Sequence, residues 1–321
     1  YVDLKGNTPE FGIQTFNDLP RYAMGYASLM NSISFTLETH MLKPFPQRVK
    51  ATVVFIDNSI QWAQLNQKEI EKSRVIARKW ESEMSYYPYN FMLTDDHDSI
   101  TFKGFEATEP LSKVTGMKRL KYDQKKPYKK EIPYYNKFKA MDSVFISDFY
   151  IVGAQCSDVI ARLKVNGIQF STLEKDTTIQ GGQTKIIGFE TGKRPYEGHF
   201  VHSEVKEEVG LAIVRFKKGD VLIPSNQKNK RFLVSVMEST APDSYFNWNF
   251  FDSYLQQKEY FSPYVFEDKA IQLLNENITL KQAFELKKTN EPSFANSSWN
   301  QLYYIYKQSE YYEPTHNVLP I

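Results

Sequence analysis

The chain has 321 residues, with 40 Lys and Arg against 38 Asp and Glu and a formal net charge of +2. This length suggests two domains at roughly 150 residues each, and the balanced charge excludes a whole-surface attraction to nucleic acid or an anionic membrane. The single cysteine, Cys156, excludes intrachain disulfides and cysteine-rich metal or redox motifs. No apolar run reaches the length of about 18 residues that a membrane-spanning helix needs, so we expect a soluble protein without membrane insertion.

The first residue and the aromatic content also allow predictions, about how the chain begins and about its fold class. The chain begins with Tyr1, without a charged segment followed by an apolar one, so we expect a processed or cut end. Aromatic residues make up 15% of the sequence, and such rings suit half-buried sheet surfaces, which favours β structure.

The N-terminal part shows a strand pattern followed by helical patterns. Ile33, Phe35 and Leu37 alternate with polar residues, which predicts a strand whose polar face carries Glu38 and then His40. From Pro46 the apolar spacing becomes helical, through Val49, Val53, Ile56 and Ile60, and a second, more charged helix carries Ile70, Ala77 and Trp80. A strand that leads into helices is typical of an α/β domain.

From residue 89 to 238, short alternating runs are separated by Gly, Pro, Asn and Asp, which favours a mainly antiparallel, β-sandwich-like domain. The expected strands are 99–105, 143–152, 184–190, 199–205, 210–217 and 231–237. We also expect a hairpin turn at Gly181 and Gly182 and a short helix over 157–164, capped by Ser157.

The C-terminal part returns to helical spacing from Ser244 onward. We expect helical structure at 250–255, 265–275 and 280–288. The sequence thus predicts an α/β part over residues 1–88, a β-rich accessory domain over 89–243, and a helical tail over 244–321 that packs on the preceding domains.

Three motifs favour structural over functional roles. The basic run 118–130 is interleaved with tyrosines, but the low net charge favours a solvated connection between strands over a nucleic-acid surface. The acidic cluster 95–98 lacks the spacing of a calcium loop and predicts a turn. His199 and His202 would point to opposite faces of a strand, so we expect one inward, hydrogen-bonded histidine and no shared metal.

Common catalytic motifs are absent from the sequence. No GxxxxGK[ST], GxGxxG, GxSxG or HExxH occurs, so no P-loop, dinucleotide, serine-hydrolase or zincin site is predicted. The segment with catalytic character is the expected strand end at Glu38, because open α/β sheets place their chemistry where strands enter loops. The alternative is a solvated carboxylate followed by His40.

The sequence around Glu38 runs Ser34-Phe35-Thr36-Leu37-Glu38-Thr39-His40-Met41-Leu42-Lys43, with Pro20-Arg21-Tyr22 and Gly25-Tyr26 before it and Arg48-Val49 after it. It resembles the last part of the catalytic domain of zinc metallocarboxypeptidases of the carboxypeptidase A type, in particular a branch of large bacterial proteins. Leu233 to Phe251, with Asn247-Trp248-Asn249-Phe250-Phe251, and Lys258-Glu259-Tyr260 resemble the downstream region of the same proteins. The resemblance therefore covers both ends of the chain.

The resemblance implies roles for four residues. Glu38 matches the general base, which takes a proton from zinc-bound water and passes it to the leaving amine. His40 would steady this carboxylate or bind substrate, unless it is simply solvated. Arg21 would pair with a substrate carboxylate, and Tyr22 would cap the substrate.

The zinc ligands of the family are the main departure from its pattern. The family uses a His-x-x-Glu pair and a third histidine, all N-terminal to the catalytic glutamate. This sequence has no histidine before Glu38, and none of its five histidines belongs to a His-x-x-Glu. Either the implied zinc is bound by an upstream part of the complete protein, leaving this chain alone inactive, or the protein is a degenerate relative.

We therefore expect the closing strand and helices of a carboxypeptidase-like α/β domain, followed by the β-rich domain and the helical tail. The resemblance implies a periplasmic or extracellular peptidase that, as a complete protein, uses zinc and a peptide substrate, with no nucleic-acid partner. The alternative is a noncatalytic β-rich module that binds a glycan or a peptide through exposed Tyr and Trp side chains.

Overall fold

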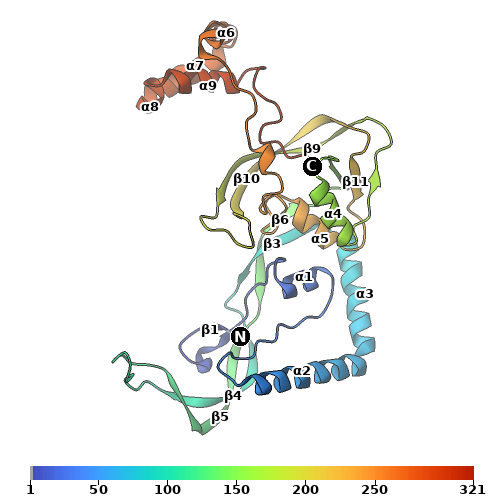
Figure 1. Cartoon of the computed structure of the whole chain (residues 1–321), viewed down its shortest axis with the longest axis vertical. Coiled ribbons are helices and arrows are strands. Elements are labelled where there is room, and N and C mark those ends of the chain that lie inside the picture. The colour runs from blue at the N-terminus through green and yellow to red at the C-terminus, as the bar shows by residue number, and fades with distance from the viewer. Residues whose placement is uncertain (1–2) are drawn as a thin grey trace. The chain divides into compact units, whose positions relative to one another are not determined.

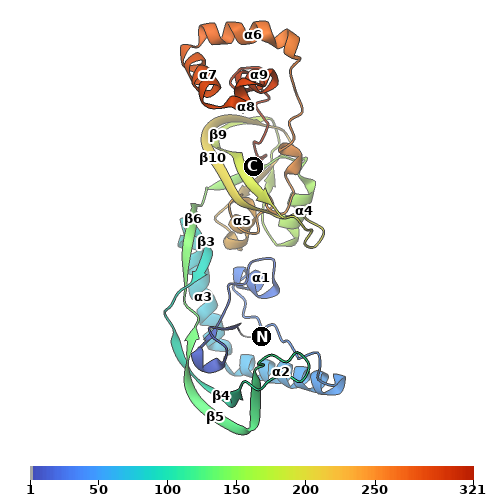
Figure 2. The ribbon, with the colours of Figure 1, turned by 90° about the vertical axis from the view of Figure 1, so that its left-hand side faces the viewer.

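The computed structural model describes residues 3–321, which form two compact units (Figures 1 and 2). Unit 1 contains the chain up to Tyr150 together with Ser157–Ser171 and Val221–Trp248. Unit 2 contains Ile151–Cys156, Thr172–Asp220 and Asn249–Ile321. Both units combine helices with antiparallel strand pairs, which confirms mixed α/β content. The division at residues 88 and 243 stays a prediction.

Unit 1 contains a four-stranded and a two-stranded sheet. The strands are β1 (Asp3–Leu4), β2 (Ile13–Gln14), β3 (Tyr86–Leu93), β4 (Asp98–Thr108), β5 (Lys121–Tyr135) and β6 (Phe138–Phe145). The larger sheet has the order β1-β2-β5-β4, and β3 pairs with β6. Unit 1 also contains β11 (Val221–Pro224) and the first residues of β7 (Phe149–Val152) and β8 (Ser171–Thr172), which belong to a sheet of order β7-β11-β8.

The expected strands of this region are partly confirmed. Strand 99–105 lies within β4, but the expected strand 143–152 is interrupted, because β6 ends at Phe145 and β7 begins at Phe149. The basic run 118–130 lies mostly in β5 and is not a connection between strands. The acidic cluster 95–98 does form the connection into β4, and Lys5 and Lys137 pair with its carboxylates.

The helices of unit 1 largely confirm the helical periodicity. They are η1 (Pro9–Phe11), α1 (Ala23–Leu29), α2 (Phe45–Leu65), α3 (Gln67–Glu83), α4 (Ser157–Val165) and α5 (Lys230–Met237). Helices α2, α3 and α4 were expected from the sequence. Among residues 3–321, no helix is both long enough and apolar enough to cross a membrane.

Helix α5 occupies a segment for which we expected a strand over 231–237, and that prediction was wrong. All residues from Phe232 to Met237 are buried. A segment buried on all sides shows no alternation that separates a strand from a helix. The buried Lys230 Nζ donates to the Met84 carbonyl oxygen over 2.6 Å, which satisfies its charge-bearing group without a carboxylate.

The strand expected at residues 33–40 was also wrong. Residues 32–40 are irregular, and Ile33, Phe35 and Leu37 are 58%, 64% and 40% exposed. Alternation gives an extended chain one apolar face, but a strand also needs a neighbouring strand for its backbone hydrogen bonds. Within the described residues no strand pairs with this segment.

Unit 2 contains a long antiparallel pair, β9 (Thr177–Thr191) and β10 (His202–Phe216). The turn expected at Gly181 and Gly182 was wrong, because both lie inside β9 and pair with Ala212 and Leu211. The chain reverses at residues 192–201 instead. The two strands expected at 199–205 and 210–217 are parts of β10, which has an irregular register near its start.

His202 is the inward, hydrogen-bonded histidine that the sequence predicts. Its Nδ1 lies 3.0 Å from Thr191 Oγ1, and its Nε2 lies 3.0 Å from Oδ1 of Asp252, which begins η2 (Asp252–Tyr254). The ring is buried, and its centroid lies 4.5 Å from that of the Phe189 ring, with the two planes tilted by 54°. These contacts tie the hairpin to the following helical segment.

The C-terminal residues of unit 2 form four helices, α6 (Pro263–Glu276), α7 (Ile278–Asn290), α8 (Pro292–Ala295) and α9 (Ser298–Lys307). The first two were expected; α8 and α9 were not, and residues 250–255 contribute only η2. Asn277 and Ser297 cap α7 and α9 through their side chains. The buried core of this cluster consists of Phe266, Ala270, Leu280, Phe284, Phe294, Leu302, Ile305 and Tyr306.

Candidate functional site

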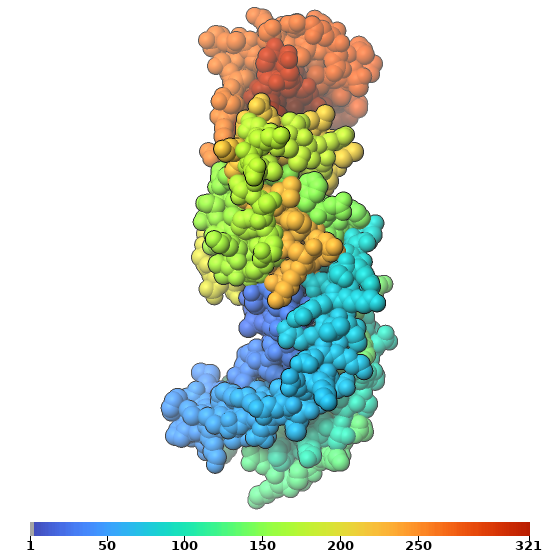
Figure 3. Space-filling view, turned by 90° about the vertical axis from the view of Figure 1, so that its right-hand side faces the viewer, coloured from blue at the N-terminus to red at the C-terminus, as the bar shows by residue number. Residues whose placement is uncertain are grey.

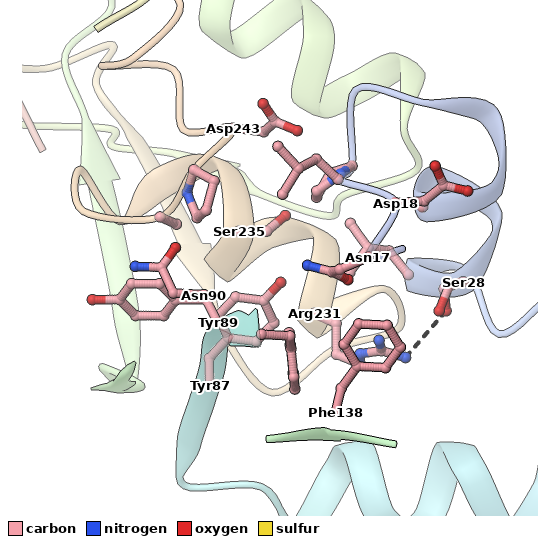
Figure 4. A pocket seen from close by; sticks show the side chains of 17 residues that line it. Asn17, Asp18, Ser28, Tyr87, Tyr89, Asn90, Phe138, Arg231, Ser235 and Asp243 are labelled. Carbon is pink, nitrogen blue, oxygen red and sulfur yellow. Dashed lines mark hydrogen bonds between the residues drawn. The ribbon is translucent and has the colours of Figure 1, made fainter. Parts of the chain in front are cut away.

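A pocket of about 270 Å³ lies within unit 1 (Figure 4). It is formed by the loop 17–20, helix α1, strand β3, the start of β6, helix α5 and residues 241–243. Gly25 lets α1 approach this loop, because a Cβ there would lie 2.2 Å from the Leu19 carbonyl oxygen. The pocket therefore depends on segments that are far apart in the sequence.

One side of the pocket is aromatic. Tyr87, Phe91 and Phe138 contribute rings, and Tyr87 is 7% exposed. Burial raises the pKa of the Tyr87 phenol, so it stays a neutral donor and acceptor at any physiological pH. In Figure 4 the Tyr87 hydroxyl and the side chains of Asn17 and Ser235 point toward the same space. The pocket thus offers rings for stacking and neutral polar groups for hydrogen bonds.

Arg231 supplies a positive charge to the pocket wall. Its Nη1 donates to the Ser28 carbonyl oxygen over 3.1 Å, and its backbone N–H donates to Glu81 Oε1 over 3.0 Å. The buried Glu81 also accepts from Asn31 over 2.7 Å. Within residues 3–321 the Arg231 guanidinium has no carboxylate partner.

Asp18 lines the same pocket from the loop before α1. Burial raises the pKa of its carboxyl group, and no described residue forms a hydrogen bond or ion pair with it. A partly desolvated carboxylate without a partner favours a ligand that donates hydrogen bonds.

Arg21 lies beside the pocket and is bound to Asp243. Its backbone N–H and Nε donate to the two carboxylate oxygens, each over 2.7 Å, and Nη2 lies 2.6 Å from Oδ1. Trp248 Nε1 also donates to Asp243 Oδ1 over 3.2 Å. Binding of a substrate carboxylate by Arg21, as the resemblance implies, would therefore have to displace Asp243.

The other residues singled out by the sequence lie on the surface. Glu38 is exposed in the irregular segment and makes no hydrogen bond or ion pair with the rest of the described chain. His40 Nδ1 accepts the backbone N–H of Leu42 over 3.2 Å. Tyr22 precedes α1 and is 45% exposed. No hydrogen bond or ion pair brings Glu38, His40 and Tyr22 together.

The described residues do not fit a catalytic zinc. Such a zinc takes three protein ligands and keeps one position for water. Between residues 3 and 321, no three His, Cys, Asp or Glu side chains converge as metal ligands would.

Sequence reasoning missed the pocket and the partner of Arg21. The pocket combines Asn17, Tyr87, Phe138 and Arg231, none of which belongs to a motif of its own. The sequence feature that bears most closely on them is the resemblance of residues 233–251, which contain Asp243. That resemblance drew attention to the segment but did not indicate a contact with Arg21.

Comparisons with known proteins add no relative. No family model matches the chain, and neither a curated protein nor a solved structure is similar to it.

Proposed function

We propose that this chain is the C-terminal portion of a zinc carboxypeptidase-like peptidase of the periplasm or the extracellular space. The complete protein would hydrolyse a peptide or amide bond near a free C-terminus by means of zinc-activated water. The proposal starts from the resemblance around Glu38 and rests on one structural observation, the apolar surface next to it.

That surface is formed by helix α2, which buries none of its residues. Figure 3 shows α2 on the surface of unit 1. Its exposed apolar side chains, with exposures from 37% to 86%, are Phe45, Val49, Val53, Val54, Phe55, Ile56, Ile60, Trp62 and Leu65. Monomeric soluble proteins rarely leave such a large patch uncovered, and a helix that is apolar on most of its faces is normally buried.

The segment that carries Glu38 has the same property. Met41 and Leu42 are 80% and 82% exposed, and Ile33 and Phe35 are more than half exposed. The irregular segment and α2 are both apolar and exposed. This matches a closing strand and helix of an α/β domain, if the other strands of its sheet come from a part of the protein outside these 321 residues. This supports the placement of Glu38 at the edge of such a sheet in the complete protein.

In that setting Glu38 would act as the general base, since its carboxylate is exposed and has no partner among the described residues. His40 and Tyr22 would contact the substrate from the neighbouring irregular segment and loop. Arg21 already binds Asp243 and would hold the loop 17–20 in place. We expect this chain alone to bind no stoichiometric zinc, and metal analysis after dialysis that finds about one zinc per chain would contradict this.

The test is Glu38→Gln in the complete protein, with Glu69→Gln on α3 as a matched, exposed control. Glutamine keeps the size of the side chain but cannot accept the proton, so hydrolysis should fall at least ~10²-fold, while the thermal midpoint stays unchanged. Undiminished hydrolysis in Glu38→Gln would reject the role of Glu38. No hydrolysis by the unmutated complete protein would favour a degenerate, inactive relative.

The alternative function is a noncatalytic module that binds a glycan or a peptide, and the pocket of unit 1 favours it. Rings such as Tyr87 and Phe138 stack on sugar or side-chain faces, and Asn17 and Ser235 offer hydrogen bonds. Calorimetric titration with oligosaccharides and short peptides tests this function. Binding that is lost in Phe138→Ala and retained in Phe149→Ala, a change outside the pocket, would support it.

A further inference from the structure

The basic run of the sequence takes part in none of the sites described above. Between Glu109 and Lys130 the chain carries eight basic residues and two acidic ones. In unit 1 this segment forms the end of the β4–β5 hairpin. Figure 1 shows it extending to one side from the ends of the two strands.

The connection between β4 and β5, residues 109–120, is the hairpin tip. It is an ordered turn: Arg119 N–H donates to the Pro110 carbonyl oxygen over 3.0 Å, and Ser112 N–H donates to the Met117 carbonyl oxygen over 2.8 Å. Gly116 adopts a φ of 71°, which glycine tolerates better than other residues. The backbone of the tip is therefore well defined.

Three large apolar side chains of the hairpin tip are strongly exposed. Val114 is 94% exposed, Met117 72% and Leu111 69%. Three large apolar side chains at the end of a hairpin do not stabilise the folded unit, because they contact water there. Such a tip gains free energy when it enters an apolar environment.

Basic side chains surround these apolar ones and lack acidic partners. Among the described residues, no carboxylate pairs with the following exposed side chains: Lys113, Lys118, Arg119, Lys121, Lys125, Lys126 and Lys129. Lys130 differs, because it pairs with Glu10 and Glu106. The unpaired charges form a positive band that extends from the tip along the first half of β5.

We propose that the hairpin tip and its basic band bind an anionic lipid surface. Apolar side chains that enter the interface, backed by lysines that meet anionic headgroups, are the two elements that peripheral membrane binding requires. Tyr122 and Tyr128 in the basic run offer rings on which bases stack. The tip itself, residues 109–120, carries no aromatic ring, and its exposed Val114 and Met117 favour lipid over nucleic acid. The nearly balanced charge of the whole chain does not prevent this attraction to anionic lipid, because the attraction is local and falls off within about 10 Å at 0.1 M salt.

The test is co-sedimentation of the 321-residue chain with two kinds of vesicle, phosphatidylcholine alone and phosphatidylcholine mixed with phosphatidylglycerol. The chain should bind the anionic vesicles, release them as salt rises, and leave neutral vesicles unbound. Each basic residue near an anionic surface contributes roughly a fivefold factor. The triple variant Lys125→Gln, Lys126→Gln and Lys129→Gln should therefore lose on the order of 100-fold in partition coefficient.

The matched control removes the same charge elsewhere, through Lys193→Gln, Lys206→Gln and Lys281→Gln, all exposed in unit 2. It should change binding by less than about threefold. Val114→Ser with Met117→Ser leaves every charge in place and should weaken binding about tenfold or more. Circular dichroism checks that each variant is folded.

Three outcomes would overturn the proposal. The first is equal binding to neutral and anionic vesicles, and the second is an equal loss in the control variant. The third is binding of a single-stranded oligonucleotide that depends on the three lysines and is indifferent to Val114 and Met117, while vesicles stay unbound.

Discussion

Helices α2 and α5 lie in the same unit, yet their environments are opposite. From Phe232 to Met237, α5 is buried throughout, and Leu233 and Val234 are fully inaccessible. No residue of the much longer α2 is buried. Apolar sequence is therefore used in two ways in unit 1, once in its core and once on an exposed surface.

The largest expected effect separates these two helices. Leu233→Ala removes a side chain that is 0% exposed and should lower the free energy of unfolding by about 4 kcal/mol. Leu65→Ala removes the same atoms from a side chain that is 86% exposed and should change it by less than about 0.5 kcal/mol. Urea unfolding of both variants measures the difference, and similar losses would mean that α2 contributes to a core.

The next effect concerns the contact between Arg21 and Asp243. Arg21→Met leaves the Asp243 carboxylate, with its side chain 4% exposed, without its ion-pair partner. The loss should be about 3 kcal/mol, because an uncompensated buried charge remains. Lys137→Met breaks a pair that is about half exposed and should cost less than ~1 kcal/mol. A small loss in Arg21→Met would show that this ion pair does not hold the loop 17–20.

A smaller effect on stability is expected for α2 itself. The triple change Val53→Ser, Ile56→Ser and Ile60→Ser should lower the fluorescence of a dye that binds apolar surface. Its free energy of unfolding should change by less than about 1 kcal/mol, because these side chains are about half exposed and serine has a helix propensity close to that of valine and isoleucine. Lys68→Ser, Lys72→Ser and Arg78→Ser on α3 are the control, which should lose more helix propensity and leave the fluorescence unchanged. Unchanged fluorescence in the α2 variant would mean that the dye binds an apolar surface other than that of α2.

The smallest effect is a pH dependence in unit 2. The Lys258 backbone N–H, which donates to Glu313 over 2.8 Å, is the main cause that lowers the pKa of that carboxyl from 4.5. A lowered pKa in the folded state means that this carboxylate stabilises the fold above pH 4.5 and that its contribution disappears as the pH falls through the folded-state pKa. Glu313→Gln should therefore flatten the decline of the thermal midpoint below that pH. An unchanged decline would contradict the assignment.

The sequence predicts those parts of the fold that depend on local spacing. Helices α2, α3 and α4 follow from apolar residues three and four positions apart. The strand expected at residues 33–40 fails because pairing depends on a neighbouring strand, which alternation cannot supply. Helix α5 was missed because a fully buried segment carries no polar face that reveals its period.

The pocket depends on tertiary structure more than these helices and strands do. Asn17, Tyr87 and Arg231 come together only because α1, β3 and α5 pack around one space. None of the three stands out by residue type or by spacing. Glu38 is the reverse case, because its sequence context singles it out, while among residues 3–321 it has no hydrogen-bond or ion-pair partner.

Under the proposed function, the apolar face of α2 is an internal surface of the complete protein. Hydrogen–deuterium exchange of Phe45–Leu65 tests it directly, in this chain alone and in the complete protein, each at a concentration where it is monomeric. The account predicts that α2 exchanges rapidly in this chain and becomes strongly protected in the complete protein, because added contacts suppress local opening. Equally rapid exchange in both would contradict the claim.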